Sequence, residues 1–231
     1  MRLGVTVAGK MLDTICADYS AHNKDIMQGT EGERIHALDV LAWVQRLKQS
    51  PALSLRLAAL FHDIDRVVTA KKGAGFKGDR RSKAYLLHKK RHARRSARFI
   101  IPLLERQGFP QRVLHRTRFL ILHHDDTGRE VDKLRDSDLN CLVAADTFAF
   151  FTSIAPALFV AEGESRTGDK IRFMVDKLPE RARRLLSKRQ LDNPTFNKLK
   201  DEIIREYSRG ASRNRQRSTK KGGGRKSAGV R

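Results

Sequence analysis

Residues 57–66, LAALFHDIDR, join the end of an apolar helix to a cluster of ionisable side chains. Leu57, Leu60 and Phe61 recur at the spacing of one buried helix face. His62 and Asp63 follow directly, although a carboxylate is rarely buried without a partner. A helix that is built for burial and ends in such a pair predicts that other polar residues meet it inside the fold.

The rest of the chain predicts an all-α protein. Apolar residues recur at helical spacing along nearly the whole sequence, and no run shows the alternation of a convincing strand. Thr30 and Glu33 have the spacing of a capping box, Ser50-Pro51 opens the next helix, and Gly108 closes a long one. Predicted helices therefore begin near residues 30, 51, 84, 110 and 137, with further helical segments at about 169–178, 180–190 and 195–207. The glycine-rich basic segment 71–83 is predicted to be a loop.

One helical domain, 1–207, followed by a basic tail, 208–231, fits the composition. A chain of 231 residues is long enough for one sizeable core. The tail lacks an apolar face and carries nine Lys or Arg but no Asp or Glu, which is typical of disorder. The net charge of +22 favours an anionic partner such as a nucleic acid, a nucleotide or an acidic surface. The tail and the basic segment 71–98 are the candidate nucleic-acid contacts; the oligomeric state is not predicted.

The cysteine content and the N-terminal sequence favour a cytoplasmic protein. Cys16 and Cys141 are too few for a disulfide framework, and the first ten residues lack the apolar run of a signal peptide. Residues 142–161 are long and apolar enough to span a bilayer. Asp146 and Pro156 are unfavourable within a span, so we predict two core helices joined near 153–156 and no membrane contact.

Five predicted helical segments each carry polar residues in an unusual setting. Asp146 is the clearest case, because the sequence CLVAADTFAFF surrounds it with apolar residues on all sides of a helix. A buried carboxylate needs an ion pair, a metal ion or a proton. Imidazole and carboxylate groups are ligands for divalent metal ions. A metal site between the helices would explain these residues together: His36, the pair His62-Asp63, His92, the pair His123-His124, and Asp146.

The order and spacing of these residues resemble the HD-domain metal-dependent phosphohydrolases. The matching positions are His36, the doublet in AALFHDIDR, His92 in HARRSA, the pair in HHDDTG, and Asp146 in AADTFAFF. The resemblance covers about residues 30–150 and implies an HD-type helical bundle. Asp65 and Arg66 stand where the family commonly has Gly-Lys, and Ala93 replaces its usual Pro. The absence of a Gly-Tyr-Pro element weakens the cyclic-dinucleotide phosphodiesterase alternative.

The resemblance implies a centre of one or two divalent metal ions. A first ion would have four ligands and would share one of them with a second ion. The implied ligands are His36, His62, Asp63 and Asp146 for the first ion, and Asp63, His92 and His123 for the second. The ion would be Mn, Fe, Co, Ni, Zn or, less readily, Mg, because imidazole–carboxylate sites accept several metals.

Three residues have implied catalytic roles. Asp63 would lie at the metal centre, Arg66 would contact a substrate phosphate through its guanidinium, and His124 would act behind a ligand or on the substrate. His123 and His124 point about 100° apart on a helix, so only one of them is expected to be a ligand. The family pattern favours His123, and the alternative stays open at this point.

Two functions of different classes follow from the sequence. The first is a phosphohydrolase that cleaves a phosphate ester or anhydride of a nucleotide or nucleic acid with metal-activated water, with a nuclease or phosphodiesterase as the narrower alternative. The second is a non-catalytic RNA- or ribosome-associated protein whose helical core is structural. Each residue alone also has a structural explanation: Asp146, for example, could pair with a buried arginine. The complete ligand set in the matching order favours the enzyme.

Overall fold

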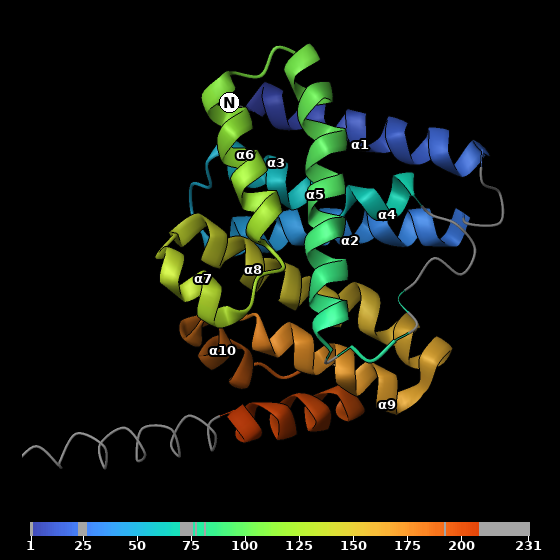
Figure 1. The fold of residues 1–231 in the computed structure, drawn as a ribbon, viewed down its shortest axis with the longest axis vertical. Helices are drawn as coiled ribbons and strands as arrows, with labels where there is room; N and C mark the ends of the chain where they lie inside the picture. Colours follow the sequence, from blue (N-terminus) through green and yellow to red (C-terminus); the bar gives the residue numbers. More distant parts are fainter. Residues whose placement is uncertain are drawn as a thin grey trace, which may run out of the picture.

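All regular secondary structure that the computed structural model describes is helical, so the predicted all-α class is confirmed (Figure 1). The described residues are 2–22, 27–69, 76, 78–80, 82–191 and 193–207, and the predicted basic tail lies outside them. The helices are α1 (Arg2–His22), α2 (Met27–Leu47), α3 (Leu53–Phe61), α4 (Ile64–Val68), α5 (Lys83–Arg106), α6 (Gln111–His123), α7 (Gly128–Leu134), α8 (Ser137–Ala149), the π-helical turn η2 (Phe150–Ile154), α9 (Ala155–Asp176), α10 (Glu180–Ser187) and a last helix over 194–207.

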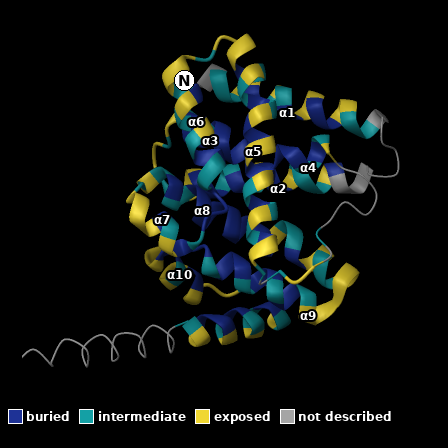
Figure 2. Ribbon diagram, viewed as in Figure 1, coloured by how far each residue is buried: buried dark blue, intermediate teal, exposed yellow. Residues whose placement is uncertain are grey.

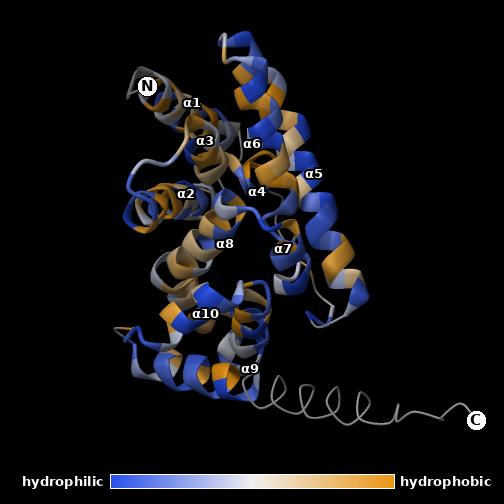
Figure 3. Ribbon diagram, turned by 90° about the vertical axis from the view of Figure 1, so that its left-hand side faces the viewer, coloured by the Kyte–Doolittle hydropathy of each residue, from blue (hydrophilic) through white to orange (hydrophobic). Residues whose placement is uncertain are grey.

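The helices enclose one continuous apolar core. α2 packs against α1, α3 and α8, and α3 also packs against α6. α5 and α6 form a helical hairpin, and α9, α10 and the helix 194–207 lie at the opposite end of the molecule from the α5–α6 loop (Figures 1 and 3). The core runs from Ala8 in α1 to Ile204 in the last helix (Figure 2). The polar residues singled out from the sequence therefore lie on helices that share one interior.

Short polar residues fix where several helices begin. Ser82 precedes α5 and accepts a hydrogen bond from the backbone N–H of Tyr85 (3.2 Å). Asp136 precedes α8 and accepts one from the N–H of Leu139 (2.9 Å). After α5, Gly108 takes a φ of +77°, which glycine adopts without strain. The predicted helix boundaries near 84, 108 and 137 are thus confirmed.

The capping box predicted at Thr30 and Glu33 is wrong. α2 already begins before Thr30, and the Thr30 side chain is buried within the helix. Glu33 accepts a hydrogen bond from Arg66 Nη1 instead (3.2 Å). In the part of the chain that the structure describes, a capping box is formed by Thr127 and Glu130, which open α7.

The apolar segment 142–161 lies within one continuous helical run. α8 passes through the π-helical turn η2 directly into α9, so the predicted junction near 153–156 is a change of helix type and not a break. Pro156 lies in the first turn of α9, where its missing N–H leaves no helical hydrogen bond unmade. Among the described residues, the run 137–176 is the one helix with the length and composition of a membrane span. Since 56% of its most apolar window is buried in the molecule, it also has the burial of a core helix.

A close approach of α7 to the end of α9 positions a buried lysine. A Cβ atom on Gly128 would lie 2.6 Å from the Asp176 carbonyl oxygen and 2.7 Å from that of Leu178. Both neighbours are backbone atoms, so only glycine fits without movement of one segment. Lys177 lies between these two residues and is 1% exposed.

Candidate metal centre

Two helices end at the same place in the core. α3 ends directly before His62, and the chain bends at His62 and Asp63 before α4 begins. α6 ends at His123, and His124 and Asp125 continue in a turn. The carboxyl end of a helix carries partial negative charge, which favours a cation nearby. The local fold thus collects imidazoles, carboxylates and two helix C-termini in one region.

The first group of candidate ligands consists of His36 from α2, His62, and Asp146 from α8. All three are buried, with at most 4% of their surface exposed. His36 Nε2 lies 3.0 Å from Asp146 Oδ1, and His62 Nε2 lies 3.6 Å from the same oxygen. Within the described part of the chain, the buried His62 Nε2 has no hydrogen-bond partner. An unpartnered ring nitrogen beside a carboxylate oxygen calls for an explanation, and a bound cation supplies one.

The second group consists of Asp63, His92 from α5, His124 and Asp125. Asp63 Oδ1 lies 2.6 Å from His92 Nε2 and 3.2 Å from His124 Nε2. His124 Nε2 also lies 3.1 Å from Asp125 Oδ2. The ring centroids of His62 and His124 are 5.0 Å apart, so the two groups adjoin.

The four imidazoles of the two groups have the same orientation: each turns Nε2 toward a carboxylate of the cluster and Nδ1 toward an anchoring partner. The Nδ1 partners are Ser153 Oγ for His36 (3.1 Å), the Ala59 carbonyl for His62 (3.0 Å), Asp65 Oδ2 for His92 (2.9 Å) and the Ile121 carbonyl for His124 (2.7 Å). A carbonyl oxygen only accepts, so Nδ1 of His62 and of His124 donates. This anchoring of one ring nitrogen is typical of imidazoles that bind a metal ion with the other.

Burial and charge move the pKa values of the two central histidines in opposite directions. Burial lowers the pKa of His62, so that its ring is neutral at pH 7. Burial alone would also lower the pKa of His124, but the carboxylates of Asp125 and Asp63 outweigh it and raise the pKa to about 9. His124 therefore carries a proton between two carboxylates, whereas neutral His62 turns a lone pair toward Asp146. A bound cation would therefore stabilise the first group more than the second.

Two buried lysines form ion pairs with the carboxylates of Asp125 and Asp146. Lys177 forms ion pairs with Asp146 and, at 3.1 Å, with Asp125, and Lys89 of α5 lies 2.5 Å from Asp125. Burial alone would raise the pKa of Asp146, but Lys177 and the neighbouring histidines hold it well below its ordinary value. Lys177 contacts Oδ2 of Asp146, so Oδ1 is the oxygen that faces His36 and His62.

Asp65 extends the second group toward the surface. Its carboxylate accepts hydrogen bonds from His92 Nδ1 (2.9 Å) and from Nε and Nη2 of Arg95 (both 2.7 Å). Burial alone would raise the pKa of Asp65, but the bonds from His92 and Arg95 lower it to about 2. Asp65, which stands where the HD family commonly has glycine, therefore orients the candidate ligand His92.

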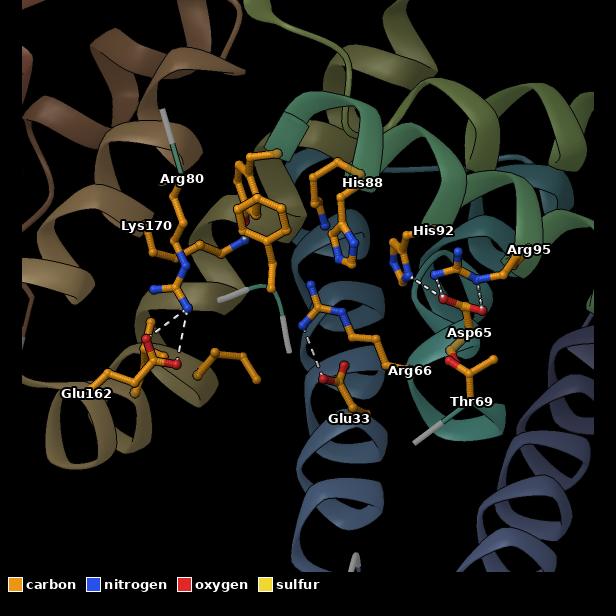
Figure 4. A pocket seen from close by; sticks show the side chains of 15 residues that line it. Glu33, Asp65, Arg66, Thr69, Arg80, His88, His92, Arg95, Glu162 and Lys170 are labelled. Carbon is orange, nitrogen blue, oxygen red and sulfur yellow. Dashed lines mark hydrogen bonds and ion pairs between the residues drawn. The ribbon is translucent and has the colours of Figure 1, made fainter. Parts of the chain in front are cut away.

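A pocket of about 360 Å³ opens beside the second group (Figure 4). Its lining combines carboxylates with cationic and aromatic side chains: Glu33, Asp65 and Glu162, then Arg66, Arg80, Lys89 and Lys170, and Phe76, Tyr85 and His88. The Phe76 ring lies 5.1 Å from that of Tyr85 and 5.3 Å from that of His88, measured between centroids. Arg66, Lys89 and Lys170 also line the narrow cavity beside His36, Asp63 and Asp146, so the pocket leads to the candidate metal centre.

Arg66 lies between the pocket and the metal centre. Its Nε is 3.0 Å from Asp63 Oδ2, and its Nη1 is 3.2 Å from Glu33 Oε1. The side chain remains 33% exposed, and Figure 4 shows it directed into the space that Lys170 and His88 also face. The guanidinium can therefore orient Asp63 and still present N–H groups to a bound anion.

His124, and not His123, lies among the candidate ligands, whereas the family pattern favours His123. His123 turns outward: its side chain is 35% exposed, and its Nδ1 lies 2.6 Å from Asp126 Oδ2. The His123 ring packs on Phe119, with centroids 4.7 Å apart. The His124 side chain is fully buried beside Asp63, and its role behind a ligand or on the substrate stays a prediction. The packing of α6 decides which of two adjacent residues faces inward.

The structure brings together the remaining predicted site residues: His36, His62, Asp63, Arg66, His92 and Asp146. Sequence reasoning missed Asp125, Lys89 and Lys177. Asp125 follows the histidine pair directly, so the argument that selected this pair as candidate ligands could also have selected Asp125. Lys177 comes two residues after the apolar run FMV of α9, a weak sign of burial, whereas Lys89 lies in the basic run KKRHARR and gave no signal.

The donor set fits a divalent metal ion. Two atoms that each lie about 2.1 Å from a tetrahedral ion are about 3.4 Å apart, close to the separations of His36 and His62 from Asp146. His62 Nε2, which has no hydrogen-bond partner among the described residues, could bind such an ion. Comparison of the chain with protein-family models, with curated proteins and with solved structures gives no match.

Proposed function

We propose that this chain is a metal-dependent phosphohydrolase with an HD-type helical core. One observation carries the proposal: buried Nε2 atoms of anchored imidazoles converge on the oxygens of Asp63, Asp125 and Asp146. The lone pair of neutral His62 faces an Asp146 oxygen and favours a cation between them, and imidazole–carboxylate sets suit Mn, Fe, Co, Ni or Zn. The order of the residues along the chain, which resembles that of the HD family, supports the same conclusion.

A divalent ion bound at these residues would lower the pKa of a water molecule and stabilise charge on a phosphoryl oxygen. The protein's own side chains supply the remaining functions. Asp63 lies between the two groups and is oriented by Arg66 and His92. Arg66, Lys89 and Lys170 surround the passage from the pocket to the centre, where their charges would bind the oxygens of a phosphate.

The pocket favours a phosphate ester or anhydride of a nucleotide or nucleic acid. Its volume of about 360 Å³ lies within the range of small-ligand sites. Cationic side chains line the part next to the metal centre, and the rings of Phe76, Tyr85 and His88 provide an aromatic wall for a base. A phosphate toward the centre and a base toward the rings would match both halves of the pocket.

The test combines metal content with hydrolysis. The full chain, purified without chelators, is analysed for bound metal and then assayed with Mn²⁺ on p-nitrophenyl phosphate, bis-p-nitrophenyl phosphate and a nucleotide panel. His62→Ala removes the unpartnered ligand atom and is expected to abolish both metal binding and turnover. His115→Ala, which removes an exposed histidine of α6, is the matched control and is expected to change neither. Equal metal content in the two variants, or no turnover of any substrate by the metal-loaded wild type, contradicts the proposal.

A second candidate function has its own supporting observation. Lys177 and Lys89 already pair with Asp146 and Asp125, so the cluster could be a structural ionic network in a non-catalytic RNA- or ribosome-associated protein. That alternative predicts no stoichiometric metal. It also predicts that His62→Ala and His115→Ala bind nucleic acid equally well.

A further inference from the structure

A shallow groove lies between α5 and α6, apart from the pocket described above. It has a volume of about 630 Å³, and five arginines line it. They are Arg91, Arg94, Arg95 and Arg98 of α5 and Arg118 of α6, and this set is called the arginine groove. Ala97, Ile101 and Leu122 add an apolar floor. In Figure 3, α5 forms one outer edge of the molecule, and much of that edge is hydrophilic.

Four of these arginines lack a counter-charge. Arg91, Arg94, Arg98 and Arg118 are exposed, and within the described residues none of them has a side-chain ion pair or hydrogen bond. By contrast, the nearby Arg116 is paired with Asp136. Like charges that converge on one groove repel one another, and a bound anion relieves that repulsion. The charge of the groove is therefore complementary to an anionic partner.

The spacing of the arginines suits a chain of phosphates better than a single ion. From Arg91 to Arg98 the helix axis advances about 10 Å at 1.5 Å per residue, so the arginines extend over more than one phosphate of a strand. Arg118 approaches the same groove from the facing helix. Among the described residues that line the groove there is no aromatic ring, so contacts would be to the backbone and not to stacked bases.

The arginine groove adjoins the pocket beside the candidate metal centre. Arg95 lines both of them, and Figure 4 shows it at the edge of the pocket, bonded to Asp65. Asp65 in turn accepts from His92, whose Nε2 faces Asp63. A nucleic-acid strand bound in the groove would therefore contact Arg95, which also lines the pocket.

We propose that the arginine groove binds the phosphate backbone of a single nucleic-acid strand and directs it to the pocket. The binding itself is independent of catalysis; only the delivery of the strand to the metal centre rests on the proposed function. Binding through backbone phosphates is independent of base sequence and weakens steeply with salt. The substrate class that follows is an oligonucleotide, with its reacting phosphate in the pocket and its neighbouring phosphates in the groove.

The experiment measures binding of a fluorescein-labelled, nuclease-resistant phosphorothioate strand to the full chain by fluorescence anisotropy over a range of salt concentrations. The groove variant combines Arg91→Ala, Arg94→Ala and Arg98→Ala. The control combines Arg181→Ala, Lys188→Ala and Lys198→Ala, which remove three exposed charges at the other end of the molecule (Figure 1). Both variants keep residues 208–231, so any binding by this segment is common to them. Circular dichroism reports whether each variant is folded.

Loss of three phosphate contacts is expected to lower the salt slope by about 2 and the affinity at about 0.1 M salt by up to about 100-fold. The control variant is expected to lose much less affinity. Equal losses in the two variants overturn the proposal. So does a groove variant that keeps its strand affinity but loses binding to vesicles of anionic phospholipid, because the partner would then be a membrane surface.

A second measurement does not depend on the folding of any variant. Wild-type protein is photocrosslinked to a strand that contains 4-thiouridine, and the modified peptides are identified by mass spectrometry. Crosslinks to residues 91–98 and to the segment around Arg118 support the proposal, and crosslinks confined to the 208–231 segment overturn it. Hydrolysis of bis-p-nitrophenyl phosphate by the same wild-type preparation tests the proposed function separately, because this small ester does not need the groove.

Discussion

Lys177 distinguishes a metal centre from a structural ionic network, because its removal has different consequences in the two cases. The side chain is 1% exposed and pairs with both Asp125 and Asp146. Replacement by methionine keeps most of the volume and removes the charge. Asp125 keeps Lys89 and His124 as partners, so the loss falls mainly on Asp146.

The expected size of the effect follows from those contacts. A buried ion pair that loses one partner typically costs 3–5 kcal/mol, so in the presence of EDTA we expect Lys177→Met to be about 4 kcal/mol less stable than wild type. For a chain of this length that corresponds to a fall in Tm of about 10 °C. A divalent ion bound at Asp146 replaces the missing positive charge. The difference between Lys177→Met and wild type is therefore expected to shrink when Mn²⁺ or Zn²⁺ is added.

The assay is urea denaturation of wild type and Lys177→Met with EDTA and with saturating metal. Metal at about 100 times Kd should stabilise any binding-competent protein by about 2.7 kcal/mol, and Lys177→Met should gain more than wild type. Lys200→Met is the matched control: Lys200 is fully buried, but its nearest carboxylate, Asp201, is 44% exposed and lies outside the cluster. Its stability loss should be the same under both conditions. A loss in Lys177→Met that metal does not reduce refutes the cation site at Asp146.

Three further substitutions test other parts of the structure. In calorimetric titrations with Mn²⁺, His124→Ala should lower the metal affinity more than about 10-fold, while His123→Ala should leave it nearly unchanged; equal effects would restore the ligand choice made from the sequence. Gly128→Ala should destabilise by about 1–3 kcal/mol in urea, since its Cβ would meet two backbone carbonyls, and an unchanged midpoint would contradict that packing. Burial lowers the pKa of Lys170 to about 8, so wild type gains stability as the pH rises from about 8 toward the unfolded pKa of 10.5. Lys170→Met should therefore exceed wild type by about 3 kcal/mol below pH 8, with the advantage declining above it, and a difference independent of pH would refute this reasoning.

The helices could be predicted from the sequence because helical periodicity is a local property. Their exact starts could not always be predicted, since two segments share the spacing of a capping box. Thr30 and Glu33 have it inside α2, and Thr127 and Glu130 have it at the start of α7. The difference is whether the preceding residues continue the helix, and this depends on what they pack against. A pattern of two residues carries no information about that packing.

The candidate site likewise has residues that the sequence predicts and residues that only the tertiary packing determines. Asp146 and His62 could be identified because ionisable groups in apolar surroundings are costly and therefore informative. Lys89 could not, since nothing in a basic run reveals which lysine turns inward. The choice between His123 and His124 depends on the rotation of α6 about its axis, which the contacts of α6 with α3 and α5 fix. Sequence reasoning thus identified most of the carboxylates and imidazoles, while tertiary packing decided between His123 and His124 and brought in Lys89 and Lys177.

The metal centre and the arginine groove are joined by a chain of hydrogen-bonded side chains, Asp63–His92–Asp65–Arg95. Because Asp65 bonds to both His92 and Arg95, its loss would disturb a candidate ligand and one wall of the groove together. Arg95 is therefore unsuitable for a test of strand binding alone, since its removal leaves the buried carboxylate of Asp65 with fewer partners. The other groove arginines have no such connection within the described residues, so their removal changes the charge of the groove and leaves this chain of contacts in place. Strand binding and metal binding can thus be separated by experiment even though one carboxylate links them.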